Sequence, residues 1–463
     1  MPARSKSKRS AAKEITIAYI GGGSRGWAHV LMTDLATRSK LTGQVRLYDI
    51  DRPMALLNAQ WGRRVNQSPQ AKSNWTYTVP RTLAQALKGA DFVVCSIQPG
   101  PMEMMGDDLA IPAKYGIIHP VGDTVGPAGL CRSLRAAIDY RQIAQAVGRH
   151  CPDAWVINYT NPMSVCTRTL YKVFPQMKAF GCCHEVFATQ RMLAEAYDYY
   201  YGFRPDRRDI RVNILGVNHF TWVDKAEYNG VDLLKLYDKR WRVKGMIRRL
   251  PPEEIQRMSY WAKNGQVVND LFRRFGILAA AGDRHLVEFL PFYLKDEATL
   301  HRWGTKLTPY SHRIERYVEM PKEFRKRLAV KTPFKLEPSN EEAVQQMEAI
   351  LGMGDMHTNV NLPNVGQMEG LPAGAIVETN AYFTKGSVKP EFSGRLPAGV
   401  QTWVALAVSN QEMIVQAALT RDKHLAFQAF LNDPLMSLTT DKAWKMFNEM
   451  LKATRKMLPG WKV

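Results

Sequence analysis

The chain has 463 residues and a formal net charge of +20, because 63 Lys and Arg residues outnumber 43 Asp and Glu residues. Hydrophobic residues make up 45% of the sequence, which is ample material for a large buried core and excludes a globally disordered chain. The apolar runs are far shorter than the roughly 20 residues of a membrane-spanning helix. We therefore expect a globular protein of two or three domains, or one large two-lobed enzyme, without a membrane partner.

The N-terminal segment and the overall charge bear on possible partners. Residues 1–13 are rich in Lys and Arg, and no apolar stretch of a secretory signal follows them, so we expect a disordered basic tail. The rest of the chain keeps most of the basic excess, which would favour acidic small substrates or polyanions. No zinc-finger spacing and no RNP-type aromatic motif is present, so nucleic acid is not expected as a partner.

The cysteines indicate the compartment. Two of the six are adjacent, and several stand in apolar, strand-like runs, which is unlike the pattern of a disulfide framework. They are Cys95, Cys131, Cys151, Cys166, Cys182 and Cys183. We therefore expect a cytoplasmic protein with reduced thiols.

The first half of the chain alternates between strand-like and helical patterns. Apolar, β-branched runs and apolar residues at helical spacing follow one another, which predicts a parallel sheet with right-handed crossovers. The predicted strands are 15–20, 44–49, 91–97, 154–159 and 177–183, and the predicted helices include 27–37 and 83–88. These elements predict an α/β, Rossmann-like domain over residues 14–200.

The pattern changes near residue 211. Residues 210–217 and 220–228 alternate in character as two strands do, and Asn229-Gly230 is a strong turn signal. Long helical patterns follow, for example over residues 341–351 and 409–419. We expect residues 201–463 to form an α+β domain that carries substrate, metal and oligomer contacts.

A glycine-rich turn follows the first predicted strand. Gly21, Gly23 and Gly26 have the spacing of a dinucleotide-binding turn, with Ser24 and Arg25 between them. Gly21 would permit the tight turn, Gly23 would let the backbone approach a pyrophosphate, and Gly26 would allow close packing of strand and helix. The following helix would offer its free N–H groups to the phosphates.

An acidic residue ends the second predicted strand. Asp49 stands where a carboxylate can accept hydrogen bonds from both ribose hydroxyls, which favours NAD over NADP, and Asp51 is a possible substitute. Arg25 and Arg52 leave NADP open, because either could reach a 2′-phosphate.

Polar blocks follow three later strands. Residues 158–163, 181–186 and 216–219 each lie just beyond an apolar run, where a parallel sheet binds its ligands. A thiolate and an imidazole from two of these blocks could share a divalent metal. Spacing alone does not distinguish such a site from unrelated polar loop residues.

Several blocks together resemble glycoside hydrolase family 4, in the order and at the separations typical of that family. They are Ile17–Asp49, Asn161-Pro162, Cys183-His184-Glu185-Val186, Asn218-His219, Ala281-Gly282-Asp283, Asn359–Asn364 and Val377-Glu378-Thr379. The resemblance implies an architecture like that of lactate and malate dehydrogenases, NAD that is bound without net turnover, and a divalent metal, commonly Mn²⁺. It also implies an exception to the two-carboxylate scheme of other glycosidases.

The implied reaction begins with oxidation of the sugar at C3 by NAD, which acidifies the C2 proton. A base removes that proton, the glycosidic oxygen leaves by elimination, water adds, and hydride returns to C3. The resemblance makes Cys183 and His219 metal ligands and Asn161 a substrate contact. Asp283 matches the proposed base and His184 the proposed acid, with Asp123 as an alternative acid or substrate contact.

Two of these roles have plain structural alternatives. His184 could serve only as a hydrogen-bond partner of other site residues, and Asp283 could be a loop carboxylate that caps the following segment. Cys182 is expected to be a small buried hydrophobe rather than a ligand.

Within the family, residues 157–168, 181–187, 122–126 and 282–285 most resemble the α-galacturonidase branch, which acts on pectin-derived sugars. A uronate carboxylate calls for arginine, and Arg284 directly follows the proposed base. Further candidates near site blocks are Arg132, Arg135 and Arg168. The resemblance also implies a homodimer or homotetramer.

Other functions stay open on the sequence. The nearest alternatives are an α-glucosidase or α-galactosidase of the same family. A plain sugar or hydroxy-acid dehydrogenase would share the nucleotide domain but release NADH. A non-catalytic NAD-sensing or nucleic-acid-binding protein would show salt-sensitive nucleic-acid binding without glycosidase activity.

Overall fold

The computed structural model describes residues 12–244, 250–260 and 264–462. The basic tail predicted for residues 1–13 lies outside the described residues as far as residue 11, and the first strand already begins at Lys13.

Six parallel strands form the first part of a nine-stranded sheet, in the order β3-β2-β1-β4-β5-β6. Their bounds are β1 (Lys13–Ile20), β2 (Leu41–Tyr48), β3 (Trp75–Thr78), β4 (Phe92–Cys95), β5 (Trp155–Asn158) and β6 (Lys178–Gly181). This is the strand order of a dinucleotide-binding Rossmann sheet. The predicted α/β fold with a Rossmann-like domain is confirmed.

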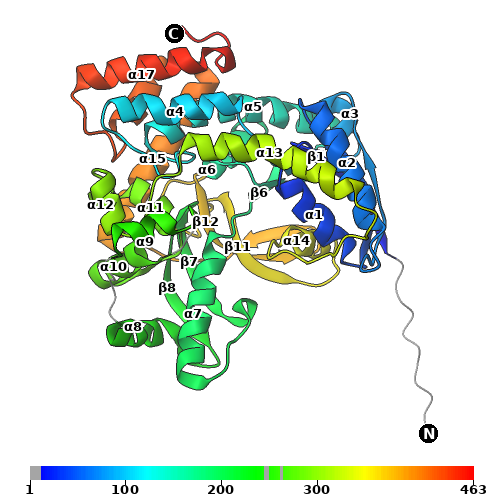
Figure 1. Ribbon diagram of the computed structural model, residues 1–463, viewed down its shortest axis with the longest axis horizontal. Coiled ribbons are helices and arrows are strands. Elements are labelled where there is room, and N and C mark those ends of the chain that lie inside the picture. Colours follow the sequence, from blue (N-terminus) through cyan, green and yellow to red (C-terminus); the bar gives the residue numbers. More distant parts are fainter. Residues whose placement is uncertain (1–11, 245–249, 261–263, 463) are drawn as a thin grey trace.

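Helices follow these strands and cover the sheet (Figure 1). They are α1 (Trp27–Ala36), α2 (Arg52–Asn66), α3 (Leu83–Leu87), α4 (Met102–Lys114), α5 (Gly126–His150), α6 (Met163–Val173) and α7 (Glu185–Tyr201). The central strands are buried on both faces: every residue of β4 is buried, as a parallel sheet between two helical layers requires.

Three antiparallel strands extend this sheet beyond β6. They are β11 (Met356–Pro363), β12 (Ile376–Thr384) and β13 (Ser387–Pro390), and Asn361 of β11 pairs with Gly181 of β6. The second half of the chain therefore completes the sheet of the first half. This brings the Asn359–Asn364 block beside the end of β6, where Cys183 follows.

A smaller sheet carries the second site block. It consists of β7 (Arg211–Val217), β8 (Phe220–Tyr228), β9 (Val231–Asp232) and β10 (Leu278–Ala279). β7 and β8 are antiparallel and are joined by Asn218 and His219. His219 has a φ of 64°, a left-handed conformation that is uncommon for a residue with a side chain and that lets the turn reverse in two residues.

Helices of the second half surround this sheet and reach back over the nucleotide domain (Figure 1). They are α8 (Leu233–Lys244), α9 (Pro252–Arg257), α10 (Gln266–Phe275), α11 (Asp283–Phe289), α12 (Glu297–Arg302), α13 (Tyr310–Ala329), α14 (Ala343–Ile350), α15 (Ala398–Thr420), α16 (Lys423–Leu431) and α17 (Thr440–Thr454). α13 lies beside α2 and α4, and α17 lies beside α4 and α5.

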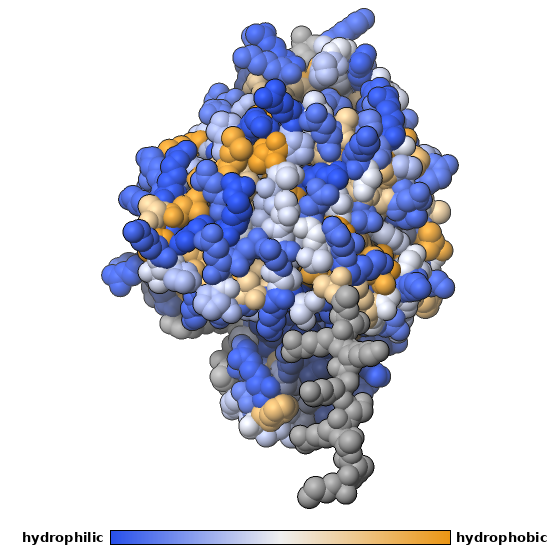
Figure 2. All heavy atoms as spheres, turned by 90° about the vertical axis from the view of Figure 1, so that its right-hand side faces the viewer, coloured by the Kyte–Doolittle hydropathy of each residue, from blue (hydrophilic) through white to orange (hydrophobic). Residues whose placement is uncertain are grey.

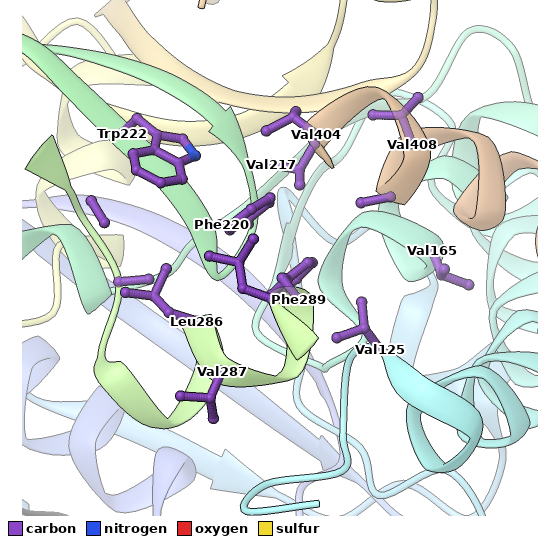
Figure 3. Packing of buried hydrophobic residues seen from close by; sticks show 14 of the residues in the cluster. Val125, Val165, Val217, Phe220, Trp222, Leu286, Val287, Phe289, Val404 and Val408 are labelled. Carbon is purple, nitrogen blue, oxygen red and sulfur yellow. The ribbon is translucent and has the colours of Figure 1, made fainter. Parts of the chain in front are cut away.

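Residues that flank several of the polar side chains belong to one apolar cluster (Figure 3). Phe220, directly after His219, stacks on Phe289 of α11 with ring centroids 4.4 Å apart. Val125 of the loop before α5 and Leu286 of α11 belong to the same cluster. The residues on either side of the polar side chains are thus fixed by packing, which holds those side chains in place.

The surface on the side of the nucleotide domain is mostly hydrophilic, with apolar residues in small separate groups (Figure 2). Among the described residues, no helix combines the length and the apolar character needed to cross a bilayer.

Candidate active site

The glycine-rich turn lies between β1 and α1. Gly21 has a φ of 92°, and a Cβ there would lie 2.0 Å from the carbonyl oxygen of Ser96, so only glycine fits. Gly26 is the N-cap of α1, where no side chain caps the helix. The close packing expected at Gly26 is absent, since an added Cβ would meet nothing within 4 Å; Gly22 is the glycine that packs against Leu47 of β2.

Asp49 closes this turn from the end of β2. Its carboxylate accepts hydrogen bonds from the backbone N–H of Gly23 at 2.7 Å and of Asp51 at 2.8 Å. Burial raises its pKa, while these two N–H groups favour the charged form. Asp49 thus fixes the glycine turn that the sequence predicts will hold a pyrophosphate.

The two arginines that left NADP open are both engaged elsewhere. The Arg25 guanidinium lies 3.3 Å from the ring centroid of Tyr317 on α13 and 3.4 Å from the carboxylate of Asp51. Arg52 donates to the carbonyl oxygens of Val79 and Pro80. Neither guanidinium is free to bind the 2′-phosphate of NADP in this arrangement, which favours NAD over NADP.

Three side chains from distant parts of the chain meet at the carboxyl end of the parallel sheet. Asp123 comes from the loop after α4, His219 from the β7–β8 turn and His285 from α11, and their potential ligand atoms all lie within 4.8 Å of one another. The two imidazole rings are stacked, with centroids 3.7 Å apart. A carboxylate and two imidazoles at this separation can hold a divalent cation.

Hydrogen bonds orient this cluster. The hydroxyl of Thr124 donates to Asp123 at 2.6 Å and lies 3.0 Å from Nδ1 of His219. On the other side, the side-chain amide of Asn161 donates to Asp123 at 3.5 Å. Asn161, predicted as a substrate contact, therefore borders the cluster directly.

The charges in the cluster are those a cation site requires. Burial opposes ionisation of Asp123, but its histidine neighbours and Arg132 outweigh burial and hold its pKa below the usual range. Burial and the adjacent His219 lower the pKa of His285 to about 3. At neutral pH the cluster therefore presents a carboxylate and a neutral imidazole, both in the protonation state of a metal ligand.

Cys183 lies at the neighbouring strand end, just beyond β6. Burial raises the pKa of its thiol well above the usual value, and Glu378 and Glu185 nearby add to the effect. The side chain of Asn218, adjacent to His219, counteracts it in part. A thiolate here would need a neighbouring positive charge, such as a bound divalent cation.

His184 faces the nucleotide side. Its Nδ1 lies 3.1 Å from a carboxylate oxygen of Glu341, and its ring is near that of Trp27, the first residue of α1. It occupies the N-cap position of α7. These contacts favour the alternative in which His184 is a hydrogen-bond partner of other site residues. About two fifths of its side chain is exposed.

Asp283 is the first residue of α11, but its carboxylate points to α10. It accepts hydrogen bonds from the backbone N–H of Gln266 at 2.8 Å and of Val268 at 3.1 Å, at the first turn of that helix. Burial raises its pKa to about 6 in spite of these donors. The side chain therefore caps a helix, although not the following one that the sequence suggested as an alternative.

The arginines fall into two groups. Arg135 is buried against Asp108 and Arg168 is paired with Glu412, so both are structural ion pairs. Arg132 lies beside Asp123 and donates to the carbonyl oxygen of Asn161. Arg284 donates to the carbonyl oxygen of Pro120 and the hydroxyl of Thr308.

The sequence pattern gave no role to His285, Thr124 or Glu378. His285 stands in the block 282–285 that resembles the α-galacturonidase branch, directly after Asp283 and Arg284. Glu378 is buried on β12 and accepts from the side chains of Asn359 and Asn218. Burial raises its pKa to about 7, a value suited to proton transfer at neutral pH.

Comparison with known proteins shows the family of the chain. Residues 16–199 match the family 4 glycosyl hydrolase and residues 214–436 match the family 4 glycosyl hydrolase C-terminal domain. A protein of Thermoanaerobacterium saccharolyticum named α-galacturonidase is 48% identical over 97% of this chain and 98% of its own length.

Two solved structures share the fold. The crystal structure of lplD from Bacillus subtilis, named a glucosidase, is 46% identical and superposes with a TM-score of 0.89 over 95% of this chain and 100% of that chain. A 6-phospho-α-glucosidase from gut microorganisms, in complex with NAD and Mn²⁺, is 21% identical with a TM-score of 0.82 over 97% and 100%.

A Rossmann sheet with its glycine turn, joined to a carboxylate–imidazole cluster at the sheet's carboxyl edge, defines an α/β enzyme of the dinucleotide-binding class. The chain belongs to glycosyl hydrolase family 4, and it is a glycoside hydrolase.

Proposed function

We propose that this enzyme hydrolyses the α-glycosidic bonds of galacturonides, such as pectin-derived oligosaccharides. The observation that carries the proposal is the 48% identity, over nearly the whole of both chains, to a protein named α-galacturonidase. An α-glucosidase or α-galactosidase of the same family is the alternative.

The charges around Asp123 support an acidic sugar. Arg132, Arg284 and Arg313 all interact electrostatically with this one carboxylate. The nearby Glu288 does not offset them at neutral pH, because burial raises its pKa to about 8. The site therefore carries a local excess of positive charge, which a uronate carboxylate would balance. Arg284 stays the proposed contact for that carboxylate, with Arg132 as the alternative.

We propose NAD as the dinucleotide. The turn from Gly21 to Gly26 fits it, because the first N–H groups of α1 have no capping side chain and no acidic residue in the first turn competes with a phosphate. Bound NAD would supply reversible oxidation of the sugar at C3. The chain's own part is to hold the pyrophosphate at the N-terminus of α1, beside the turn that Asp49 fixes through the N–H of Gly23, and to place Asp49 at the ribose.

We propose that Asp123, His219 and His285 hold a divalent cation, Mn²⁺ or a related ion, with Cys183 as the ligand implied by the family. The donor set fits, and Nδ1 of His285 is buried without a hydrogen-bond partner among the described residues. A bound cation would act as a Lewis acid toward the C2 and C3 oxygens of the sugar. Asn161 would then position a sugar hydroxyl beside Asp123.

The proton transfers need a base at C2 and an acid at the leaving oxygen. Asp283 remains the proposed base, but in this role its carboxylate must leave the N–H groups of α10. His184 remains the proposed acid, oriented by Glu341, with Asp123 as the alternative. Glu378, with a pKa of about 7, joins them as a candidate for either transfer.

We further propose a homodimer or homotetramer in the cytoplasm. All six cysteines are within the described residues and none forms a disulfide, which agrees with a reducing compartment. Sedimentation of the purified enzyme would measure the assembly.

The proposal is tested by assaying aryl α-galacturonide, α-galactoside and α-glucoside side by side with NAD, Mn²⁺ and a thiol reductant. We expect cleavage of the galacturonide to exceed that of the neutral glycosides. Preference for a neutral glycoside would establish the alternative. NADH that accumulates without glycoside cleavage would indicate a dehydrogenase, and nucleic-acid binding without cleavage would indicate the non-catalytic function.

A further inference from the structure

The loop from Pro120 to Gly126 carries Asp123 and Thr124, and side chains from three other segments hold its backbone. Two of these segments, α11 and α13, precede the C-terminal helices, and the third is the turn after α16. The position of this loop sets the position of Asp123 relative to His219 and His285. The side chains that bind the loop backbone therefore affect the geometry of the proposed cation site.

Glu288 of α11 holds the first half of the loop. One of its carboxyl oxygens accepts hydrogen bonds from the backbone N–H of Val121 at 2.7 Å and of Gly122 at 2.9 Å. The side chain is about 1% exposed. His285 lies three residues earlier on the same helix, so α11 supplies both a cluster residue and the group that fixes the loop opposite it.

The other end of the loop is held in the same way. The backbone N–H of Gly126 donates to Asp433 at 2.9 Å, and Asp433 also accepts from the N–H of Leu435. The carbonyl oxygen of Pro120 accepts from both Arg284 and Arg313. Buried N–H groups and carbonyls of an irregular loop are thus paired with charged or acidic side chains, which fixes its conformation.

Thr124 shows what this conformation achieves. Its hydroxyl connects Asp123, on its own loop, to His219 of the β7–β8 turn. A loop shifted by about 1 Å would break this connection and move the carboxylate out of reach of the two imidazoles, as misplacement of that size does in metal sites.

We propose that Glu288 is a positioning residue for the cation site: by binding the N–H groups of Val121 and Gly122 it holds Asp123 in register with His219 and His285. This inference rests on the proposed cation site. It assigns Glu288 no contact with the sugar or the ion.

The test measures Mn²⁺ affinity by electron paramagnetic resonance and NAD affinity by calorimetry on the same purified proteins, without substrate. Glu288→Ala removes the acceptor and should weaken Mn²⁺ binding by about 10- to 100-fold, the usual effect of losing a partner that orients a ligand. NAD affinity should stay within about twofold, because the glycine turn is untouched. Glu288→Gln keeps an oxygen acceptor without charge, as in the protonated carboxyl, and should restore wild-type Mn²⁺ affinity.

Two further variants make the result decisive. Asp433→Ala releases the other end of the loop and should weaken Mn²⁺ binding in the same direction, which keeps the test available if Glu288→Ala does not fold. Asp422→Ala removes a helix cap that accepts from Leu425 at 2.9 Å, far from this loop in the chain, and controls for lost stability. It should leave Mn²⁺ affinity unchanged.

The outcomes separate the two proposals. Wild-type enzyme that binds Mn²⁺, with Glu288→Ala and Asp433→Ala binding it equally well, would overturn the positioning role and leave the cation site standing. Wild-type enzyme that binds no divalent cation would overturn the cation site itself. Equal loss of Mn²⁺ and NAD affinity in Glu288→Ala, not restored by Gln, would show a general structural role and also refute the inference.

Discussion

The imidazole rings of His219 and His285 are stacked with their centroids 3.7 Å apart, although one comes from a β-turn and the other from α11. Two rings this close would repel each other if both were protonated, and burial lowers the pKa of His285 to about 3. His285 is therefore a neutral imidazole beside the Asp123 carboxylate at neutral pH, and both groups are in the protonation state of a metal ligand.

Replacing either ring should impair cation binding. We expect His285→Gln to weaken Mn²⁺ affinity by roughly 100-fold or more, since a lost ligand costs more than a lost orienting partner. His219→Gln should have a comparable effect, and both variants should bind NAD normally. Equilibrium dialysis with Mn²⁺ measures this directly. Unchanged affinity in His285→Gln would remove this residue from the site.

Cys183→Ser tests the ligand that the family implies. If the thiolate contacts the cation, Mn²⁺-dependent activity should be lost while NAD binding is retained, because serine is a poor substitute for a thiolate. Full activity of the serine variant would exclude the thiolate and leave the cation with Asp123 and the two histidines.

The glycines of the turn should respond differently to alanine. Gly21→Ala should destabilise the fold by on the order of 3 kcal/mol, since its Cβ would overlap the Ser96 carbonyl. Gly26→Ala should change stability by less than about 0.5 kcal/mol, because nothing lies within 4 Å of its Cβ. If a pyrophosphate occupies the open space at the N-cap of α1, the methyl group added by Gly26→Ala would intrude on it and should weaken NAD affinity by about tenfold. Chemical denaturation and calorimetry measure the two effects, and normal NAD affinity would place the cofactor elsewhere.

Much of the first sheet could be predicted from the sequence, because its buried strands are continuous apolar runs that short-range pattern reveals. β3, β11, β12 and β13 could not be predicted in this way. β11, with the sequence MHTNVNLP, carries several polar side chains inside the protein, and other segments supply hydrogen-bond partners for Thr358 and Asn359. Its place beside β6 depends on a contact between residues far apart in the chain, Asn361 and Gly181.

The site shows the same division. The glycine turn and Asp49 can be recognised from a short stretch of sequence, and the order of several short blocks indicated the family. The cluster of Asp123, His219 and His285 cannot be recognised in this way, because the three residues are widely separated in sequence. The packing of the apolar residues next to them brings them together. Only the spacing of His285 and Glu288, three residues apart in a helical pattern, indicates that one face of α11 lies at the site.

Asp283→Asn separates the two roles of this residue. Both oxygens of Asp283 accept backbone N–H groups, and asparagine replaces one of them by a donor, so a capping role predicts a loss of stability with kcat of the folded enzyme nearly unchanged. A base at C2 predicts in addition a loss of about 10²- to 10⁴-fold in kcat of the folded enzyme. Steady-state kinetics and thermal denaturation of this variant decide between them, and activity close to the wild type would transfer the base role to another residue such as Glu378.

The buried Glu288 should make stability depend on pH. Burial raises its pKa from 4.5 to about 8, so between these values the folded protein holds a proton that the unfolded chain has released. The stabilisation is complete below pH 4.5 and is lost as the pH rises through 8. In metal-free protein, urea denaturation from pH 5 to 9 should show a steeper fall of the unfolding free energy for wild type than for Glu288→Gln. Parallel curves would contradict the shift.

The central claim is that this enzyme cleaves α-galacturonides through loss of the C2 proton, and isotope exchange tests it most directly. The reaction is run in D₂O with NAD and Mn²⁺, and the released galacturonate is examined by NMR and mass spectrometry. A carboxylate that has taken the C2 proton exchanges it with solvent, so deuterium should appear at C2 while C3 keeps its hydrogen. Galacturonate without deuterium at C2, released by enzyme that is active without NAD, would contradict the account.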